Sequence, residues 1–532
     1  MRKLVITTII LLIATAAITV VYFKNLSPPG SNTSRVIEAI PDNASVIFQF
    51  TNEKSFYDIF SDNTLLTSVI GKDNLAYIDT LRSVLLGNPL LHKYFDGQSL
   101  FVSLHTLKNN DAALLLSISA LKGFDISVME QLAKQHNTGL IIHAERIGGM
   151  QGYNIYINAI KMRFYVVDKG DNIFSGSFSE ELAGQSAAYR PTGKKNFVLL
   201  PEQQNSNSLA NLYVNYEALE PLFSKLFSNN KNTDIFKNFK GLPAEAALSL
   251  NYKNDAFMFS GTTTLQGNHP ESYLNLFADQ QPVVNHLKDI FPATTAYSTN
   301  FAVSDAAKFA KDLYQYNDKM GRQHEEDSLF MKIKAEAGIS LRTEFSNLLG
   351  NEFAIVTTRY QEKYAIIAIK DGSKLTPLML NISNMVTDKI GQFKFDKIPF
   401  FLLGDAFSIL KHPYFMIVDN YLILATTQNE LTSYYDTYFN RKFLSKMDQY
   451  NQFDNLQAER SNVAFFINFK NTQPIFKRDM DAGFYDAYES NNPGWKNFYG
   501  ASFQFAASDK NFYTNFCMRL NNTDTTAVNN GF

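Results

Sequence analysis

The chain has 532 residues, which is too long for one ordinary hydrophobic core and predicts about two to four domains. Its hydrophobic content of 45% and charged content of 19% exclude a disordered chain, while 45 Phe and 27 Tyr favour strands. Lys and Arg total 49 against 51 Asp and Glu, without a basic run longer than two, which argues against a nucleic-acid partner. The single cysteine, Cys517, excludes an internal disulfide and a cysteine-based zinc site.

The N-terminal segment, residues 1–24, contains the uncharged apolar run Leu4–Phe23, preceded by Arg2 and Lys3. A helix of this length spans ~30 Å, the thickness of a bilayer's hydrocarbon core. A cleavable signal peptide is the alternative, because Ala14–Ala16 has a small-x-small pattern, but the apolar run continues beyond it. We therefore expect an uncleaved, single-pass anchor in the inner membrane, with its basic end in the cytoplasm and the body in the periplasm.

The anchor is followed by a Pro-, Gly- and Ser-rich linker at 25–35, which is short enough to keep the body close to the membrane. A first half is expected at 36–268, a second half at 269–520 and a loose polar tail at 521–532. In the first half, strands are predicted at 45–50, 99–104, 112–119, 140–143, 153–158, 162–167, 172–177, 209–215, 247–252 and 256–265. Helices are predicted at 54–60, 75–86 and 128–134 and after Ser179.

The second half repeats the order of the first. Ser208–Phe223 recurs as Ser461–Phe476, with the matched Ser, Asn, aromatic, Pro and Phe positions all 253 residues apart. In both copies an apolar strand is expected to lead into a helix that begins near the proline. Further landmarks recur at nearly the same offset: Ile40-Pro41 as Phe291-Pro292, Gly97 as Gly350, and Asp168 as Asp419. This pattern predicts an internal duplication.

The predicted fold class is α+β, with two tandem, similar, β-rich halves built from largely antiparallel sheets and flanking helices. Strand candidates outnumber helix candidates, and hairpin turns such as residues 168–171 connect several of them. Between the halves, Tyr273–Ile290 is expected to be helical, because its apolar residues fall on one helical face.

No catalytic, cofactor-binding or metal-binding residue is identified in the sequence. The histidines form no ligand-spaced motif, and the group His324–Asp327 is expected to be a solvated charged face. Gly148–Gly152 is expected to be a turn, Cys517 a buried small hydrophobe, and Asp479 and Asp481 helix-end or surface charges.

The opening Ile40–Ile47, IPDNASVI, together with the anchor and the duplicated body, resembles an uncharacterised family of exported, membrane-anchored bacterial proteins that contain a domain of unknown function. The resemblance would cover Val36–Leu520. It implies an exported body but no activity, so no site residue is transferred from it.

The leading functional hypothesis is a membrane-tethered cell-envelope protein acting as a non-enzymatic binding or scaffolding module, without a cofactor and without nucleic acid. Its partners would be the membrane, through Leu4–Phe23, and an envelope protein. The first alternative is a carrier or sensor for a hydrophobic ligand held between the halves, since aromatic residues can line such a site. The second is an envelope enzyme whose site is assembled from distant residues.

Overall fold

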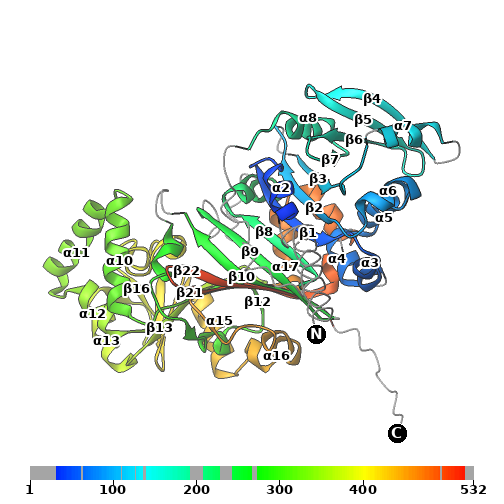
Figure 1. Cartoon of the computed structure of the whole chain (residues 1–532). Helices are drawn as coiled ribbons and strands as arrows, with labels where there is room; N and C mark the ends of the chain where they lie inside the picture. The colour runs from blue at the N-terminus through cyan, green and yellow to red at the C-terminus, as the bar shows by residue number, and fades with distance from the viewer. Residues whose placement is uncertain are drawn as a thin grey trace, which may run out of the picture. The chain divides into compact units, whose positions relative to one another are not determined.

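The computed structural model describes residues 31–61, 64–108, 111–125, 127–135, 139–191, 208–227, 242–253, 255–266, 272–491 and 494–521 (Figure 1). They pack as two compact units. The first contains residues 31–56 and Thr80–Tyr213, and the second contains Tyr57–Asp79 and residues 214–521. The predicted anchor Leu4–Phe23 and the tail beyond residue 521 lie outside the described residues. No helix in the described part of the chain is long and apolar enough to span a membrane.

Helix α2, Ser31–Glu38, covers the last residues of the stretch predicted as a linker. Its Val36 and Ile37 are buried, and the helix packs on strands β2 and β3. Burial of two branched apolar side chains explains why the helix begins before the expected end of the linker. The part of the linker before Ser31 lies outside the described residues.

The first unit is built on one sheet. Its strands lie in the spatial order β8 (Ala210–Asn215), β1 (Ala44–Thr51), β2 (Ser99–Thr106), β3 (Ala112–Ser119), β7 (Ile173–Ser177), β6 (Met162–Asp168), β5 (Met150–Ile157) and β4 (Leu140–Ile147). Neighbouring strands from β1 to β4 are antiparallel. All eight strands were predicted from the sequence, within a few residues of these bounds.

Short helices accompany this sheet: α6 (Pro89–Phe95), α7 (Ser127–Lys134) and α8 (Glu180–Ala188). Ser179 caps α8 by accepting a hydrogen bond from the Leu182 amide at 3.3 Å, as its position before Glu180 and Glu181 predicts. The helix predicted at 75–86 is divided into α5 (Lys72–Leu81) and a π-helical turn, Arg82–Leu86.

The second unit has a longer antiparallel sheet. Its order is β9 (Ala244–Lys253), β10 (Ala256–Leu265), β22 (Asn511–Leu520), β21 (Phe498–Ser508), β20 (Val463–Asn468), β12 (Thr295–Ala302), β13 (Leu349–Thr358), β14 (Lys363–Ile369), β18 (Tyr421–Ala425), β17 (Tyr414–Val418), β16 (Gly391–Phe393) and β15 (Ser383–Met385). The α+β class with a large antiparallel sheet is therefore confirmed.

Helices of the second unit gather in groups (Figure 1). They are α3 (Lys54–Ser61, which begins in the first unit), α4 (Thr64–Ile70), α9 (Glu220–Leu226), α10 (Ala306–Lys319), α11 (Gln323–Ala337), α12 (Leu341–Leu348), α13 (Gly372–Asn381), α14 (Ile398–Leu403), α15 (Gln428–Phe439), α16 (Asp448–Asp454), α17 (Phe469–Asp479) and α18 (Ala482–Glu489). The helices α10, α12 and α14 pack on one another beside fully buried aromatic rings, among them Phe277, Phe301, Phe309 and Phe353. These rings supply much of the apolar burial at this end of the sheet.

Strand pairing follows one order in both units. The order β8-β1-β2-β3-β7-β6-β5-β4 in the first unit matches β20-β12-β13-β14-β18-β17-β16-β15 in the second. A β-bulge occurs at the matching place in each, between Ala44 and Val46 in β1 and between Thr295 and Tyr297 in β12. In chain order, the hairpin β9–β10 follows β8, and the hairpin β21–β22 follows β20. Strands β10 and β22 pair with each other.

Two local predictions are wrong. Tyr273–Ile290 is not one helix but two 3₁₀ turns, Tyr273–Phe277 and Leu287–Ile290, separated by the short strand β11 (Val283–Val284). Pro282 precedes that strand and cannot supply a helical N–H donor. In the recurring motif, Pro221 lies at the start of α9 as predicted, but Pro474 lies inside α17.

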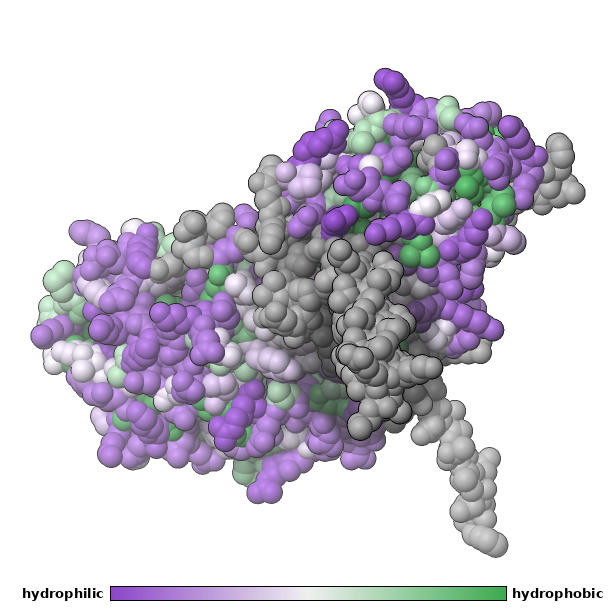
Figure 2. All heavy atoms as spheres, viewed as in Figure 1, coloured by the Kyte–Doolittle hydropathy of each residue, from purple (hydrophilic) through white to green (hydrophobic). Residues whose placement is uncertain are grey.

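The surface in view is mainly hydrophilic in both units, with apolar side chains in small groups (Figure 2). The most exposed large apolar side chain among the described residues is Phe439, at the end of α15. Scattered exposed apolar residues are ordinary for a folded domain.

Candidate functional site

A pocket of about 400 Å³ lies in the second unit, between one end of the sheet and the C-terminal turn of α17. Its lining consists of Tyr297 from β12, Thr357 from β13, Gln361 and Lys363 from the β13–β14 hairpin, and Ile475, Arg478 and Asp479 from α17. A volume of this size falls within the range of small-molecule sites, roughly 300–1,000 Å³.

Three of these residues form a row across neighbouring strands. Tyr297 pairs with Thr357 across β12 and β13, and Thr357 pairs with Lys363 across β13 and β14. Directly opposed residues place their side chains on the same face of a sheet, so the row presents a phenol, a hydroxyl and an ammonium group together. The bulge beside Tyr297 marks the point where β12 bends, a feature that is common next to binding sites.

The hydroxyl of Thr357 is buried without a partner. The residue is 2% exposed, and its Oγ1 atom has no hydrogen-bond partner among the described residues. The next residue, Thr358, is also buried, but its Oγ1 donates to the Glu362 carboxylate at 2.8 Å. A buried polar atom left unpaired costs ~1–3 kcal/mol.

Asp479 supplies a buried carboxylate. Its side chain is 1% exposed, and it accepts hydrogen bonds from Nε and Nη2 of Arg478, whose side chain is 46% exposed. The Nη2–Oδ2 distance is 2.6 Å. These bonds raise the pKa of the Arg478 guanidinium above its usual value. Two-point contact of this kind fixes both groups in one plane.

The expectation that Asp479 is a helix-end or surface charge is confirmed for the helix end, since Asp479 is the last residue of α17, and wrong for the surface. It lies at the C-terminal end of α17, where the helix dipole disfavours a carboxylate, and it is buried as well. Asp481 does fit the expectation, because it caps α18 by accepting from the Gly483 amide at 3.1 Å.

The matching positions in the first half are apolar. Val46 follows the bulge in β1 and pairs with Leu104, which pairs with Leu114. These three residues correspond in position to Tyr297, Thr357 and Lys363. In the recurring motif, Leu226 lies 253 residues before Asp479. The same strand order therefore forms with apolar residues at four positions where the pocket is polar.

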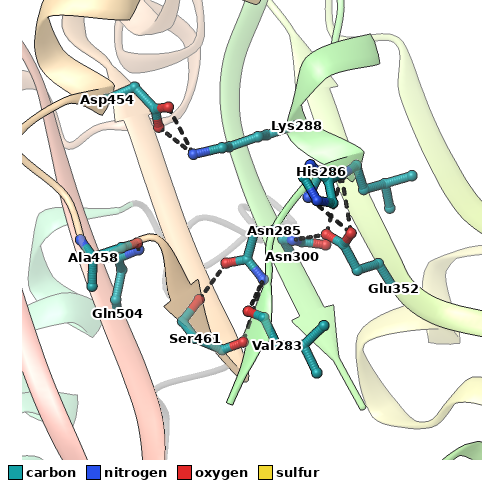
Figure 3. A network of polar contacts seen from close by, with 11 residues as sticks. Val283, Asn285, His286, Lys288, Asn300, Glu352, Asp454, Ala458, Ser461 and Gln504 are labelled. Carbon is teal, nitrogen blue, oxygen red and sulfur yellow. Dashed lines mark hydrogen bonds and ion pairs between the residues drawn. The ribbon is translucent and has the colours of Figure 1, made fainter. Parts of the chain in front are cut away.

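A second polar group, shown in Figure 3, surrounds the buried carboxylate of Glu352. Glu352 accepts from the main-chain amides of His286 at 2.9 Å and Leu287 at 3.1 Å, and from Nδ2 of Asn300 at 2.9 Å. These donors belong to the connection before β12 and to β12 itself. The carboxylate thus caps the 3₁₀ turn Leu287–Ile290, which is a structural role.

The same connection is held at two further points. Lys288 contacts both oxygens of Asp454 in α16, at 2.6 and 2.7 Å, and Asn285 exchanges hydrogen bonds with Ser461 beside the β11–β19 pairing (Figure 3). These groups satisfy one another and line no described pocket. We assign them to the positioning of the chain between the halves.

The other groups considered from sequence are structural. Glu326 is 1% exposed and bonds Asn317 at 2.9 Å and Arg342 at 2.9 Å, so the expectation of a fully solvated face at His324–Asp327 is wrong for this residue. Cys517 is buried in β22, and burial raises the pKa of its thiol to about 12. Gly148 and Gly149 form the β4–β5 turn with positive φ, as predicted, whereas Gly152, the last residue of the expected turn, lies in β5 and pairs with Val167.

Within the described residues, no group of three or more His, Cys, Asp or Glu is arranged to hold a metal ion. No protein-family model, curated protein or solved structure matches the chain. The pocket is therefore interpreted from the residues that line it.

The lining residues of the pocket are spread over two strands, a hairpin and a helix, so no local sequence motif marks them. Comparison of the two halves would have found them, as polar residues at positions that are apolar in the first half.

Proposed function

We propose that the chain is a membrane-tethered cell-envelope protein with a duplicated α+β body, and that its second half is a non-enzymatic binding module for a small polar molecule. The tether rests on the sequence of Leu4–Phe23 and on the resemblance of Ile40–Ile47 to exported proteins. The binding role rests on the pocket lined by Tyr297, Thr357 and Lys363.

Duplication is supported by the eight strands that pair in the same order in each unit and by the matching bulges in β1 and β12. A further contact involves the recurring motif itself. Phe227 follows α9 and Met480 follows α17, the two lie 253 residues apart, and they form an antiparallel β-bridge with each other. Contact between equivalent residues is typical of a two-fold arrangement of similar elements.

The observation that carries the binding role is the change of chemistry at matched positions. The fold does not require polar side chains at these positions, because the first half forms the same strand pairs with Val46, Leu104 and Leu114. The second half instead bears the cost of a buried, unpaired Thr357 hydroxyl and a buried Asp479 carboxylate. We infer that polar residues beside a pocket, at positions where the first half has apolar ones, serve a ligand that enters this pocket.

Binding is favoured over catalysis because no activated nucleophile is present among the lining residues. A hydroxyl nucleophile needs a base within hydrogen-bond reach, and Thr357 Oγ1 has no partner in the described part of the chain. The charges of Lys363, Arg478 and Asp479 also favour a polar ligand over the hydrophobic ligand of the alternative hypothesis.

A thermal-shift screen of the full-length chain in detergent, against a library of water-soluble metabolites, tests the proposal. We expect at least one compound to raise the melting temperature of the wild type and not of Lys363→Leu, which introduces the residue found at position 114. Lys374→Leu is the matched control, because this lysine is exposed on α13. A library without a hit, or hits unchanged in Lys363→Leu, would contradict a binding role for the pocket.

A further inference from the structure

The sheet of the first unit ends in a long edge strand. Strand β4, Leu140–Ile147, pairs with β5 and, among the described residues, with no other strand (Figure 1). Natural proteins usually shorten an edge strand or interrupt it with a proline or a bulge, because its free main-chain groups can pair with another chain. Strand β4 has eight residues and neither device, whereas its counterpart β15 in the second half has three residues.

The alternation of hydrogen bonds shows which main-chain groups of β4 are free. The amide of Asn158 donates to the main-chain oxygen of Gly139 at 2.9 Å, so Gly139 and every second residue after it face β5. The N–H and C=O groups of Ile142, Ala144 and Arg146 therefore point away from β5, and they have no main-chain partner in the described part of the chain. Ala144 and Arg146 are exposed, so this edge is open to another strand.

The side chains of the edge are complementary to those of a second copy. His143 and Glu145 are both exposed and lie on the same face of β4, because they are two residues apart. When two copies of β4 run antiparallel with Ala144 at the centre, His143 lies opposite Glu145 of the partner subunit, and Glu145 lies opposite the partner's His143. An imidazole N–H donates a hydrogen bond to a carboxylate, so each of these pairs is favourable.

A shift of the centre by one residue removes this complementarity. With His143 at the centre, the two imidazoles oppose each other. With Glu145 at the centre, the two carboxylates oppose each other, and like charges directly opposite destabilise a sheet. Charge therefore selects the register that is centred on Ala144.

The same register also satisfies the free main-chain groups. Ala144 pairs with its own copy, and Ile142 pairs with Arg146, which gives about six main-chain hydrogen bonds across the two strands. The small side chain of Ala144 lies at the two-fold axis. Ile141, which is 48% exposed, lies opposite Ile147 and is partly covered by the pairing.

We propose that two copies of the chain associate through β4, with the strands antiparallel and centred on Ala144. The interface is self-complementary, as a two-fold interface has to be, because one strand supplies both members of each side-chain pair. It lies in the first unit and uses no residue of the pocket, so it stands or fails independently of the proposed binding function.

Analytical ultracentrifugation of the full-length chain in detergent, over a range of protein concentrations, tests the association. We expect the wild type to form a dimer. His143→Glu should raise the dissociation constant of this dimer about tenfold or more, because it places carboxylates opposite each other at two symmetric positions. His143→Glu combined with Glu145→Lys should restore the wild-type value, since each new carboxylate then lies opposite an ammonium group. A folding defect would not show this rescue.

Cysteine crosslinking tests the register. Ala144→Cys should form a disulfide between two copies, because the Cα atoms of a central hydrogen-bonded pair are ~5.5 Å apart, within the range of a disulfide. Arg146→Cys is the matched control, since Arg146 is also exposed but lies opposite Ile142, which separates its two copies by about 13 Å along the strand. The wild type, whose Cys517 is buried, gives the background.

Three results would overturn the proposal. They are a wild type that stays monomeric, a dimer whose dissociation constant is unchanged in His143→Glu, and crosslinking of Arg146→Cys equal to that of Ala144→Cys. Crosslinking of Ala144→Cys in cells to a different protein, and not to a second copy, would likewise contradict it by placing another chain at this edge.

Discussion

Tyr297 lies directly opposite Thr357 across β12 and β13, next to a bulge in β12, and the equivalent bulge in β1 is followed by the apolar pair Val46 and Leu104. The backbone arrangement is thus repeated while the side-chain chemistry differs. Both halves form the same strand pairs, so a residue type found in only one half is not required for those pairs. Such a difference indicates a residue that serves a site.

The unpaired hydroxyl of Thr357 predicts an unusual response to a conservative change. Thr357→Val removes a buried group without a partner, so the free energy of unfolding should rise by ~1 kcal/mol. Thr358→Val is the matched control, because Thr358 donates to Glu362, and it should lower the same free energy by ~1 kcal/mol. Urea unfolding measures both. Destabilisation by Thr357→Val similar to that by Thr358→Val would show that the Thr357 hydroxyl is already paired.

The carboxylate of Glu352 should stabilise the connection before β12. In Glu352→Gln an amide group replaces one oxygen that accepts from His286, Leu287 or Asn300, and the free energy of unfolding should fall by ~2 kcal/mol. Glu325→Gln changes an exposed ion pair with Lys397 and should cost less than ~0.5 kcal/mol. Similar denaturation curves for the two variants would argue against the capping role.

A pH effect is expected from Lys169 in the first unit. Its ammonium group donates to the main-chain oxygens of Ser186 and Tyr189 at the end of α8. Burial, and then the nearby Arg190, lower its pKa from 10.5 to about 8. Because the folded state holds this proton less tightly than the unfolded state, the contribution of Lys169 to stability should rise as the pH increases from about 8 to about 10.5.

The comparison of wild type with Lys169→Met isolates this effect from the titration of tyrosines and other lysines. Urea unfolding at pH values across that interval should show the wild type gaining stability relative to the variant. Parallel curves would mean that the Lys169 pKa is the same in both states.

The membrane tether is tested by a reporter enzyme that is active only outside the cytoplasm, fused after Arg35. We expect activity from the native sequence, because Leu4–Phe23 should direct the following chain across the membrane. Deletion of Leu4–Phe23 is the control and should abolish activity. An active reporter without this segment, or an inactive one with it, would reject the predicted topology.

Much of the fold could be predicted because it depends on local patterns. Runs of strand-forming residues predicted β3 and β10 with the bounds that the structure has, and hairpin turns predicted antiparallel pairing. The connection Tyr273–Ile290 was mispredicted since its apolar spacing fits a helix while Pro282 interrupts the hydrogen-bond ladder.

The site could not be predicted residue by residue. Burial of Asp479 depends on how α17 packs against β12, and isolation of the Thr357 hydroxyl depends on which donors the neighbouring strands supply. Neither follows from the residues next to them in the chain. The helix-end interpretation of Asp479 was right in position, and the surface interpretation was wrong because Asp479 is buried.

The most direct measurement is made on one variant that carries the first-half residues in the second half, Tyr297→Val with Thr357→Leu and Lys363→Leu. We expect this protein to fold with a cooperative urea transition, because the same strand order already accommodates an apolar row, and we expect the cavity left by Tyr297→Val to lower the midpoint of that transition. We also expect it to lose the binding of any metabolite that raises the melting temperature of the wild type. A folded variant that binds this metabolite with unchanged affinity would contradict the assignment of the pocket as the binding site.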